Sequence, residues 1–178
     1  MFIYKHISKE LLIFSLILTM FSFSISYGAF VPNPYFDSNI GGWFTAYENP
    51  FPYHSADFGT VKWSSRYDGS AYLKVSGSPG VADLITFVRA TINPGDVIKC
   101  RVTTGDMSSS TFCFQINGYW NTDVTQGAEP ITQSNVTRTM RIVANETYPP
   151  GTPIILHLVC WPGYGEVWVD DVDLIRGD

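Results

Sequence analysis

From residue 59 onwards the sequence is dominated by short runs in which apolar and polar residues alternate. Between positions 98 and 103, for example, Ile98, Cys100 and Val102 alternate with two basic residues and a threonine. Successive side chains of a β-strand point to opposite faces, so this period of two indicates strands that are buried on one face. No segment carries the 3.6-residue apolar stripe of an amphipathic helix. The chain is therefore predicted to be all-β.

Residues that favour turns separate these runs, as in Asp68-Gly69, Asn93-Pro94-Gly95 and Pro149-Pro150-Gly151. Many short strands of this kind in a single domain predict a two-sheet antiparallel β-sandwich of the jelly-roll kind. The predicted strands are Gly59–Ser64, Ala71–Gly77, Ala82–Ile92, Asp96–Thr103, Thr111–Asn117, Ser134–Val143, Pro153–Trp161 and Glu166–Ile175.

Residues 1–28 have the pattern of a secretory signal peptide. Lys5 and Lys9 precede an apolar run from Leu11 to about Ile25, and the small residues Ser26 and Gly28 favour cleavage after Gly28. The run is shorter than the roughly 20 residues that span a bilayer, so an uncleaved anchor is the weaker alternative. We expect a secreted protein without membrane insertion after signal cleavage, with residues 29–178 forming one domain and acting as a monomer.

The charge of the expected mature chain limits its partners. Nine Lys and Arg residues stand against 15 Asp and Glu residues in 29–178, a net charge of −6. Nucleic acids and anionic membrane surfaces both require a basic patch, so neither is predicted as a partner.

Three cysteines follow the signal, and their spacing does not match a zinc or redox motif. Strand alternation places Cys100 and Cys160 among core residues, whereas Cys113 faces away from Phe112 and Phe114. The sequence leaves open whether one disulfide forms, and which of the three cysteines would form it.

Four blocks of the sequence resemble the jelly-roll carbohydrate-binding modules of families 4, 9 and 22, and more loosely the galactose-binding-like fold. They read "NPYFDSNIGGW", "YDGSAYLKV", "NPGDVIKCRV" and "VWVDDVDL", and together they span nearly the whole expected mature chain. The first and last blocks belong to segments that meet in such folds. The resemblance therefore predicts that the two ends of this domain lie together.

The resemblance also implies one structural calcium ion between the first block, the early glycine turn and the last strand. Its ligands would be the Asp37 carboxylate, backbone oxygens near Tyr67 and Ser70, and Asp170. Calcium accepts carboxylate and carbonyl oxygens in flexible shells, which suits such a set. Asp37 stands where Glu is usual, and Tyr67 where an acidic residue or His is common. The alternative is that Asp170 and Asp171 only cap a strand end in solvent.

Sugar binding requires flat rings that stack on the apolar faces of pyranoses, and polar groups that pair with hydroxyls. Among the tryptophans, Trp43 and Trp168 are predicted to be core, Trp63 could be core or surface, and Tyr119-Trp120 resembles a loop platform flanked by amides. His157 could bond a hydroxyl, but a lone strand histidine more often serves packing. The predicted ligand-binding residues are Phe87, Arg89, Gln115, Asn117, Tyr119, Trp120 and Trp161.

The sequence contains no recognisable nucleophile–base motif or metalloprotease motif, so we predict that the protein is not an enzyme. The predicted function is that of a secreted, non-catalytic module that binds a polysaccharide or another glycan. The alternative is a structural or adhesive surface protein that uses the same fold for protein contacts. A small jelly-roll polysaccharide lyase is the weaker enzyme alternative.

Overall fold

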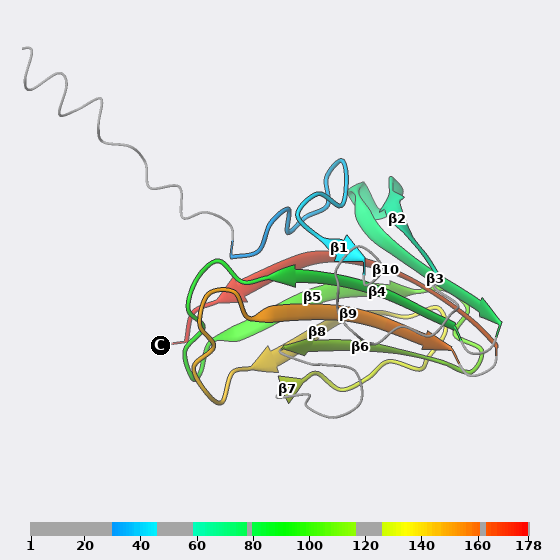
Figure 1. Cartoon of the computed structure of the whole chain (residues 1–178). Coiled ribbons are helices and arrows are strands. Elements are labelled where there is room, and N and C mark those ends of the chain that lie inside the picture. Colours follow the sequence, from blue (N-terminus) through cyan, green and yellow to red (C-terminus); the bar gives the residue numbers. More distant parts are fainter. Residues whose placement is uncertain (1–29, 46–58, 78–79, 117–125, 161–162, 178) are drawn as a thin grey trace, which may run out of the picture.

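The protein is a sandwich of two antiparallel five-stranded sheets in a computed structural model, which describes residues 30–45, 59–77, 80–116, 126–160 and 163–177 (Figure 1). The all-β jelly-roll prediction is confirmed. Among the described residues the only helical element is a 3-10 turn, η1 (Arg66–Asp68), and none forms a helix long and apolar enough to cross a membrane.

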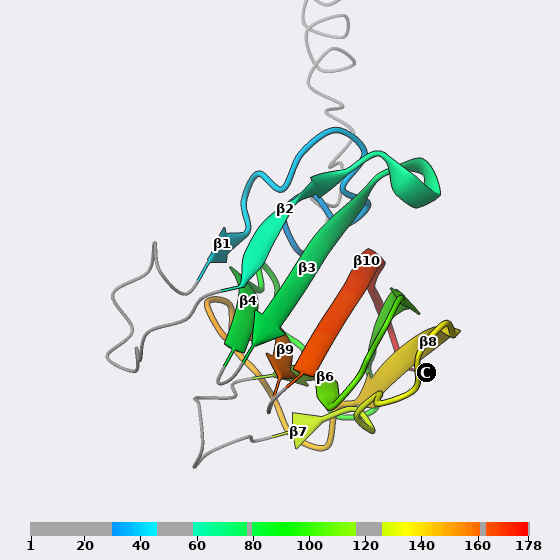
Figure 2. The same ribbon diagram turned by 90° about the vertical axis from the view of Figure 1, so that its right-hand side faces the viewer.

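Sheet A has the order β1-β4-β9-β6-β7, and sheet B has the order β2-β3-β10-β5-β8. The strands of sheet A are β1 (Phe44–Thr45), β4 (Gly80–Phe87), β9 (Pro153–Cys160), β6 (Ser110–Ile116) and β7 (Gln126–Gly127). Those of sheet B are β2 (Thr60–Ser64), β3 (Ser70–Gly77), β10 (Gly163–Ile175), β5 (Val97–Thr104) and β8 (Thr137–Val143). Figure 2, turned by 90° from Figure 1, shows the two layers next to one another.

All eight predicted strands exist, and their bounds differ from the prediction in instructive ways. β4 ends at Phe87 rather than at Ile92, because the partner chain turns there: the Thr152 N–H donates to the Pro149 carbonyl, and the Val88 carbonyl accepts from Gly151 instead. Ile92 instead forms an isolated bridge with Tyr148. β1 and β7 were not predicted, since two residues are too few to show a period.

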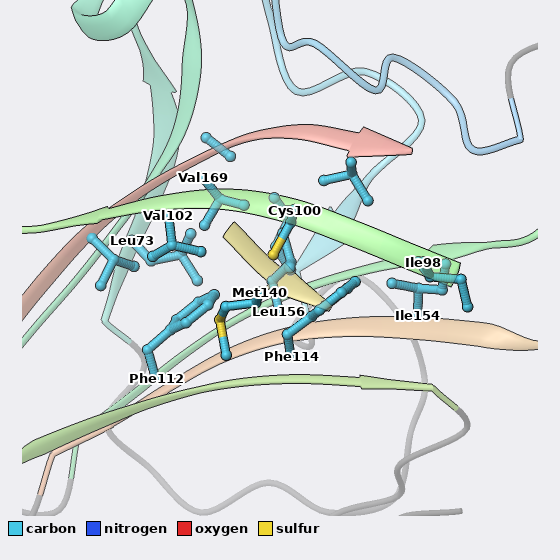
Figure 3. Packing of buried hydrophobic residues seen from close by; sticks show 14 of the residues in the cluster. Leu73, Ile98, Cys100, Val102, Phe112, Phe114, Met140, Ile154, Leu156 and Val169 are labelled. Carbon is cyan, nitrogen blue, oxygen red and sulfur yellow. The ribbon is translucent and has the colours of Figure 1, made fainter. Parts of the chain in front are cut away.

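The core lies between the sheets and consists of the inward residues of the alternating strands (Figure 3). β5 and β6 alternate strictly between buried and half-buried positions, as the sequence period requires. Cys100 and Cys160 are fully buried in this core, and Cys113 is half-buried on the other side of its strand, as predicted. All three cysteines are free thiols.

A β-bulge interrupts the alternation of buried and exposed positions in β10. The pairing of β10 with β5 shifts between Asp170 and Asp173, and Asp171 takes a positive φ of 52°. The extra residue inverts the alternation beyond it, so the side chains of Trp168 and Val172 point to opposite faces of sheet B. Trp168 is buried as predicted, but it lies on the outer face of sheet B, where its ring packs 5.1 Å from that of Tyr72.

The N-terminal segment and the last strand meet, as the resemblance predicted. The Val172 N–H donates to the Pro34 carbonyl at 2.9 Å, and the Trp63 indole N–H donates to the Phe36 carbonyl at 2.6 Å. Gly69 permits this close approach, because a Cβ at its position would lie 2.6 Å from the Phe36 oxygen. In Figure 1 the N-terminal segment, drawn in blue, runs beside β10.

Asp96 connects the residues that follow β10 to the turn before β5 through hydrogen bonds. Its carboxylate accepts hydrogen bonds from the backbone N–H groups of Asn93 and Gly177 and from the Arg176 guanidinium, at 2.6 to 2.9 Å. Burial raises the pKa of Asp96, but these three donors outweigh burial and hold the pKa below its ordinary value of 3.8. The ionised carboxylate is therefore favoured by folding.

We expect Asp96→Ala to lower the free energy of unfolding at pH 7 by about 1–3 kcal/mol, since it leaves buried donors unpaired. Because the folded pKa is lowered, this contribution is complete above the ordinary value of 3.8 and declines as the pH falls through the folded pKa. Urea denaturation at pH 7 and pH 2.5 measures the difference. An equal loss at both pH values would contradict the role of the ionised carboxylate.

Candidate functional site

The outer face of sheet A carries three rows of side chains that point away from the core. One row is Asp83, His157 and Cys113, which pair directly across β4, β9 and β6. A second row pairs Ile85 with Ile155, which form a small cluster separate from the main core. A third row pairs Val81, Val159 and Thr111. The described face is thus a polar row between two apolar ones.

Aromatic side chains lie at one margin of this face. Phe44 of β1 is opposite Ile85 and is 42% exposed, and its ring centroid lies 6.5 Å from that of Phe87. Gln115 continues the isoleucine row on β6, where it pairs with Ile155. Rings, an amide and a carboxylate on one sheet face are the kinds of group that contact sugars.

Asp83 and His157 form a buried polar pair in the middle row. The Nδ1–H of His157 donates to Oδ1 of Asp83. The Asp83 side chain is fully buried and that of His157 is 11% exposed. Burying a carboxylate on the outside of a sandwich contributes nothing to the core between the sheets. Such a pair therefore marks the face as a candidate site.

Cys113 completes a row of thiol, imidazole and carboxylate, the residue types of a nucleophile, a base and an orienting acid. A nucleophilic cysteine needs a lowered pKa. Burial instead raises the pKa of the Cys113 thiol, and no opposing charge offsets this effect. The row is therefore better suited to recognition than to covalent chemistry.

The structure places three of the seven predicted ligand-binding residues. Phe87 and Gln115 point outward from the outer face of sheet A, each half-buried. Arg89 is exposed and lies beyond the end of β4, so it is not part of the strand face that carries Phe87. The other four lie outside the described residues: Asn117, Tyr119, Trp120 and Trp161.

Sequence reasoning missed Asp83, although its signal was present. It is the one charged residue in the run Val81-Ala82-Asp83-Leu84-Ile85, at an outward position of the alternation. Its partner His157 is 74 positions away in the sequence. Only the register of β4 against β9 shows that the two side chains meet.

The structure brings together the segments that were predicted to bind calcium, at one end of sheet B. The backbone of Asp37 lies against Gly69, Tyr67 packs on Trp168 at 5.8 Å, and the Ser70 hydroxyl donates to the Arg66 carbonyl. Within the described residues, no three His, Cys, Asp or Glu side chains gather in a way that could hold a metal ion.

The Asp170 carboxylate already has a cation beside it. Arg101 Nη2 lies 2.5 Å from Asp170 Oδ2, and Arg101 Nε lies 3.0 Å from Asp171 Oδ2. Burial raises the pKa of Asp170, and the guanidinium only partly offsets it. Arg101 thus already pairs with the carboxylate that the resemblance assigned to calcium. Calcium binding itself stays a prediction.

The fold, but not the sequence, has known counterparts. No family model and no curated protein sequence matches the chain. Among solved structures, it is similar to the carbohydrate-binding module TmCBM61 in complex with beta-1,4-galactotriose (TM-score 0.57, 10% identity, covering 83% of this chain and 98% of that one). It is also similar to a family 16 carbohydrate-binding module (TM-score 0.52, 12% identity, covering 83% and 99%).

A third similar structure is the enzymatically active domain of tailspike protein 4 from bacteriophage CBA120 (TM-score 0.56, 16% identity). The match covers 83% of this chain but only 21% of the tailspike chain, so this protein corresponds to a small part of it. At these identities the comparisons show the fold alone. The chain thus has the jelly-roll fold of carbohydrate-binding modules, as the sequence blocks predicted.

We expect EDTA to leave the melting temperature of the protein unchanged, because Arg101 supplies the positive charge that neutralises Asp170. Arg101→Ala should lower the melting temperature, whereas Arg101→Lys should retain part of the stability because it keeps the charge and loses the two-pronged geometry. Differential scanning calorimetry with and without EDTA measures both effects. A fall of several degrees in EDTA for the unsubstituted protein would instead support the calcium prediction.

Proposed function

We propose that this protein is a secreted, non-catalytic carbohydrate-binding module that binds an oligo- or polysaccharide on the outer face of sheet A. The observation that carries the proposal is the buried Asp83–His157 pair on that face, between apolar rows and next to the aromatic margin of Phe44 and Phe87. Sugars present both C–H faces and hydroxyls, so a site for them needs apolar surface and buried polar partners together.

The similar structures support this proposal at the level of the fold. TmCBM61 was solved with a neutral galactose trisaccharide, and the present chain covers nearly its entire length. The outer face of sheet A is also favoured over that of sheet B as a stacking surface. The Trp168 ring on sheet B is covered by the Arg66 guanidinium, which lies 4.7 Å from the ring centroid, and by the Tyr72 ring.

The non-catalytic part of the proposal rests on the chemistry of the middle row. Covalent catalysis would require a thiolate at Cys113, and burial favours the neutral thiol by raising its pKa. Asp83 is committed to His157 through Oδ1. Binding without turnover is the simpler use of these groups.

An adhesive protein that contacts other proteins is the second candidate function. The aliphatic side chains of Val81, Ile85, Ile155 and Val159 favour it, since they make up much of the described face. A glycan panel separates the two candidates, because the adhesive function predicts no bound sugar.

We expect the protein to bind at least one glycan in a panel of neutral oligosaccharides and insoluble polysaccharides. Trp120→Ala should weaken binding by about tenfold or more while the melting temperature is retained, since a stacked ring contributes on the order of 1–2 kcal/mol. Trp63→Ala is the matched control, because that ring lies on an edge strand of sheet B. Its melting temperature is measured alongside, since the Trp63 indole N–H also donates to the Phe36 carbonyl. Equal loss in both variants would argue against Trp120 as a specific platform, and no glycan hit would favour the adhesive function.

A bound glycan should also protect Cys113 from alkylation. Cys113 is half-buried on the outer face of sheet A, whereas Cys100 and Cys160 are fully buried in the core. We expect iodoacetamide to modify Cys113 alone in the folded protein. The reaction should be slow at neutral pH because burial raises the thiol pKa, and it should become faster as the pH rises and the thiolate forms. Peptide mass spectrometry with and without the glycan measures the protection. Full binding without protection would place the sugar elsewhere.

A further inference from the structure

One oxygen of the Asp83 carboxylate has no hydrogen-bond donor. Oδ1 is bonded to His157, but Oδ2 is buried and has no partner within the described structure. It is the only buried side-chain oxygen or nitrogen atom in that condition among the described residues. Every other described carboxylate that is comparably buried, at Asp96 and at Asp170, has donors on both of its oxygens.

An unsatisfied charged oxygen destabilises a folded protein, because it has lost its hydrogen bonds to water and has formed none within the protein. No backbone N–H group of the described residues donates to Oδ2 either. The missing donor must therefore come from outside the described fold. A hydroxyl group of a ligand is neutral and donates one hydrogen bond, which is the interaction that Oδ2 lacks.

The charge of sheet A restricts the ligand further. No Lys or Arg occurs in β1, β4, β6, β7 or β9, whereas the strands of sheet B contain six. A ligand carboxylate or sulfate beside Asp83 would meet no basic strand residue that could neutralise it, because the exposed Arg89 lies beyond the end of β4, six positions from Asp83. Like charges at close range in a buried setting repel strongly.

We propose that Asp83 is the specificity-determining residue of the sheet A site, where its Oδ2 accepts a hydrogen bond from a hydroxyl of a neutral sugar. This inference rests on the proposed function and deepens it, because it names the ligand class and the atom that orients the ligand. Acidic glycans, including polyuronates, are rejected at this position. His157 acts through Asp83, which it holds in place by the bond to Oδ1.

Asp83→Asn tests the inference with little change in shape. The asparagine oxygen can still accept the Nδ1–H of His157, while the group at the Oδ2 position becomes a neutral NH₂ donor. Asp170→Asn is the matched control, since Asp170 is also a buried strand carboxylate, but it pairs with Arg101 and lies on sheet B. Isothermal titration calorimetry of the full-length proteins with galactotriose, cellotriose, xylotriose and trigalacturonate provides the affinities, and calorimetric melting gives the stability.

We expect the unsubstituted protein to bind at least one neutral trisaccharide and to bind trigalacturonate at least tenfold more weakly. Asp83→Asn should weaken neutral binding by about tenfold or more while the melting temperature holds, since a hydrogen bond to a charged acceptor is lost. Asp170→Asn should bind normally. Unchanged affinity in Asp83→Asn, or equal binding of trigalacturonate, would overturn the inference and leave the proposed function intact.

A purely structural role for Asp83 gives a different result, namely a lower melting temperature in Asp83→Asn with the affinity unchanged. Failure of every trisaccharide and of the wider glycan panel to bind the unsubstituted protein would overturn the proposed function itself, and this inference with it. The two failures are therefore distinguishable.

Discussion

The pairing of β4 with β9 is the constraint on which the rest of the structure depends. This register sets Leu84 against Leu156 in the core, and one residue earlier it sets Asp83 against His157 on the outside. A slip of one residue would expose the leucines and send the carboxylate into the core, at a cost of several kcal/mol. The packing of the sandwich therefore positions Asp83 against His157. The hydrogen bond between them is not needed to bring the two side chains together.

Two other buried carboxylates, those of Asp96 and Asp170, have more hydrogen-bond donors than Asp83. Asp96 accepts from three donors at the end of β10, and Asp170 accepts from Arg101 and from the Asp171 N–H at the bulge. The contacts of Asp170 with Arg101 and of Asp96 with Arg176 join residues 69 and 80 positions apart in the sequence, so they stabilise the sandwich as a whole. Against this background, an unsatisfied carboxylate oxygen on the outer face of sheet A indicates a site that is completed by another molecule.

The fold was predictable because its signal is local. The alternation of Ile98, Cys100 and Val102 with polar residues defines a strand with one buried face, and such runs identified eight strands. The sheet face on which Trp168 lies was not predictable. The bulge at Asp170 and Asp171 inverts the alternation of β10, and no glycine in the sequence marks its position. The candidate site was predicted only in part, at Phe87 and Gln115. Asp83 and His157 meet through a long-range register that no local pattern carries.

The central claim is that a sugar binds on the outer face of sheet A, and chemical-shift mapping by NMR tests it most directly. On titration with a neutral oligosaccharide that binds, the amide signals of Asp83, Cys113, Gln115 and His157 should shift, while those of Tyr72, Arg101 and Trp168 on sheet B stay in place. Shifts confined to sheet B, or spread evenly over both sheets, would contradict the account.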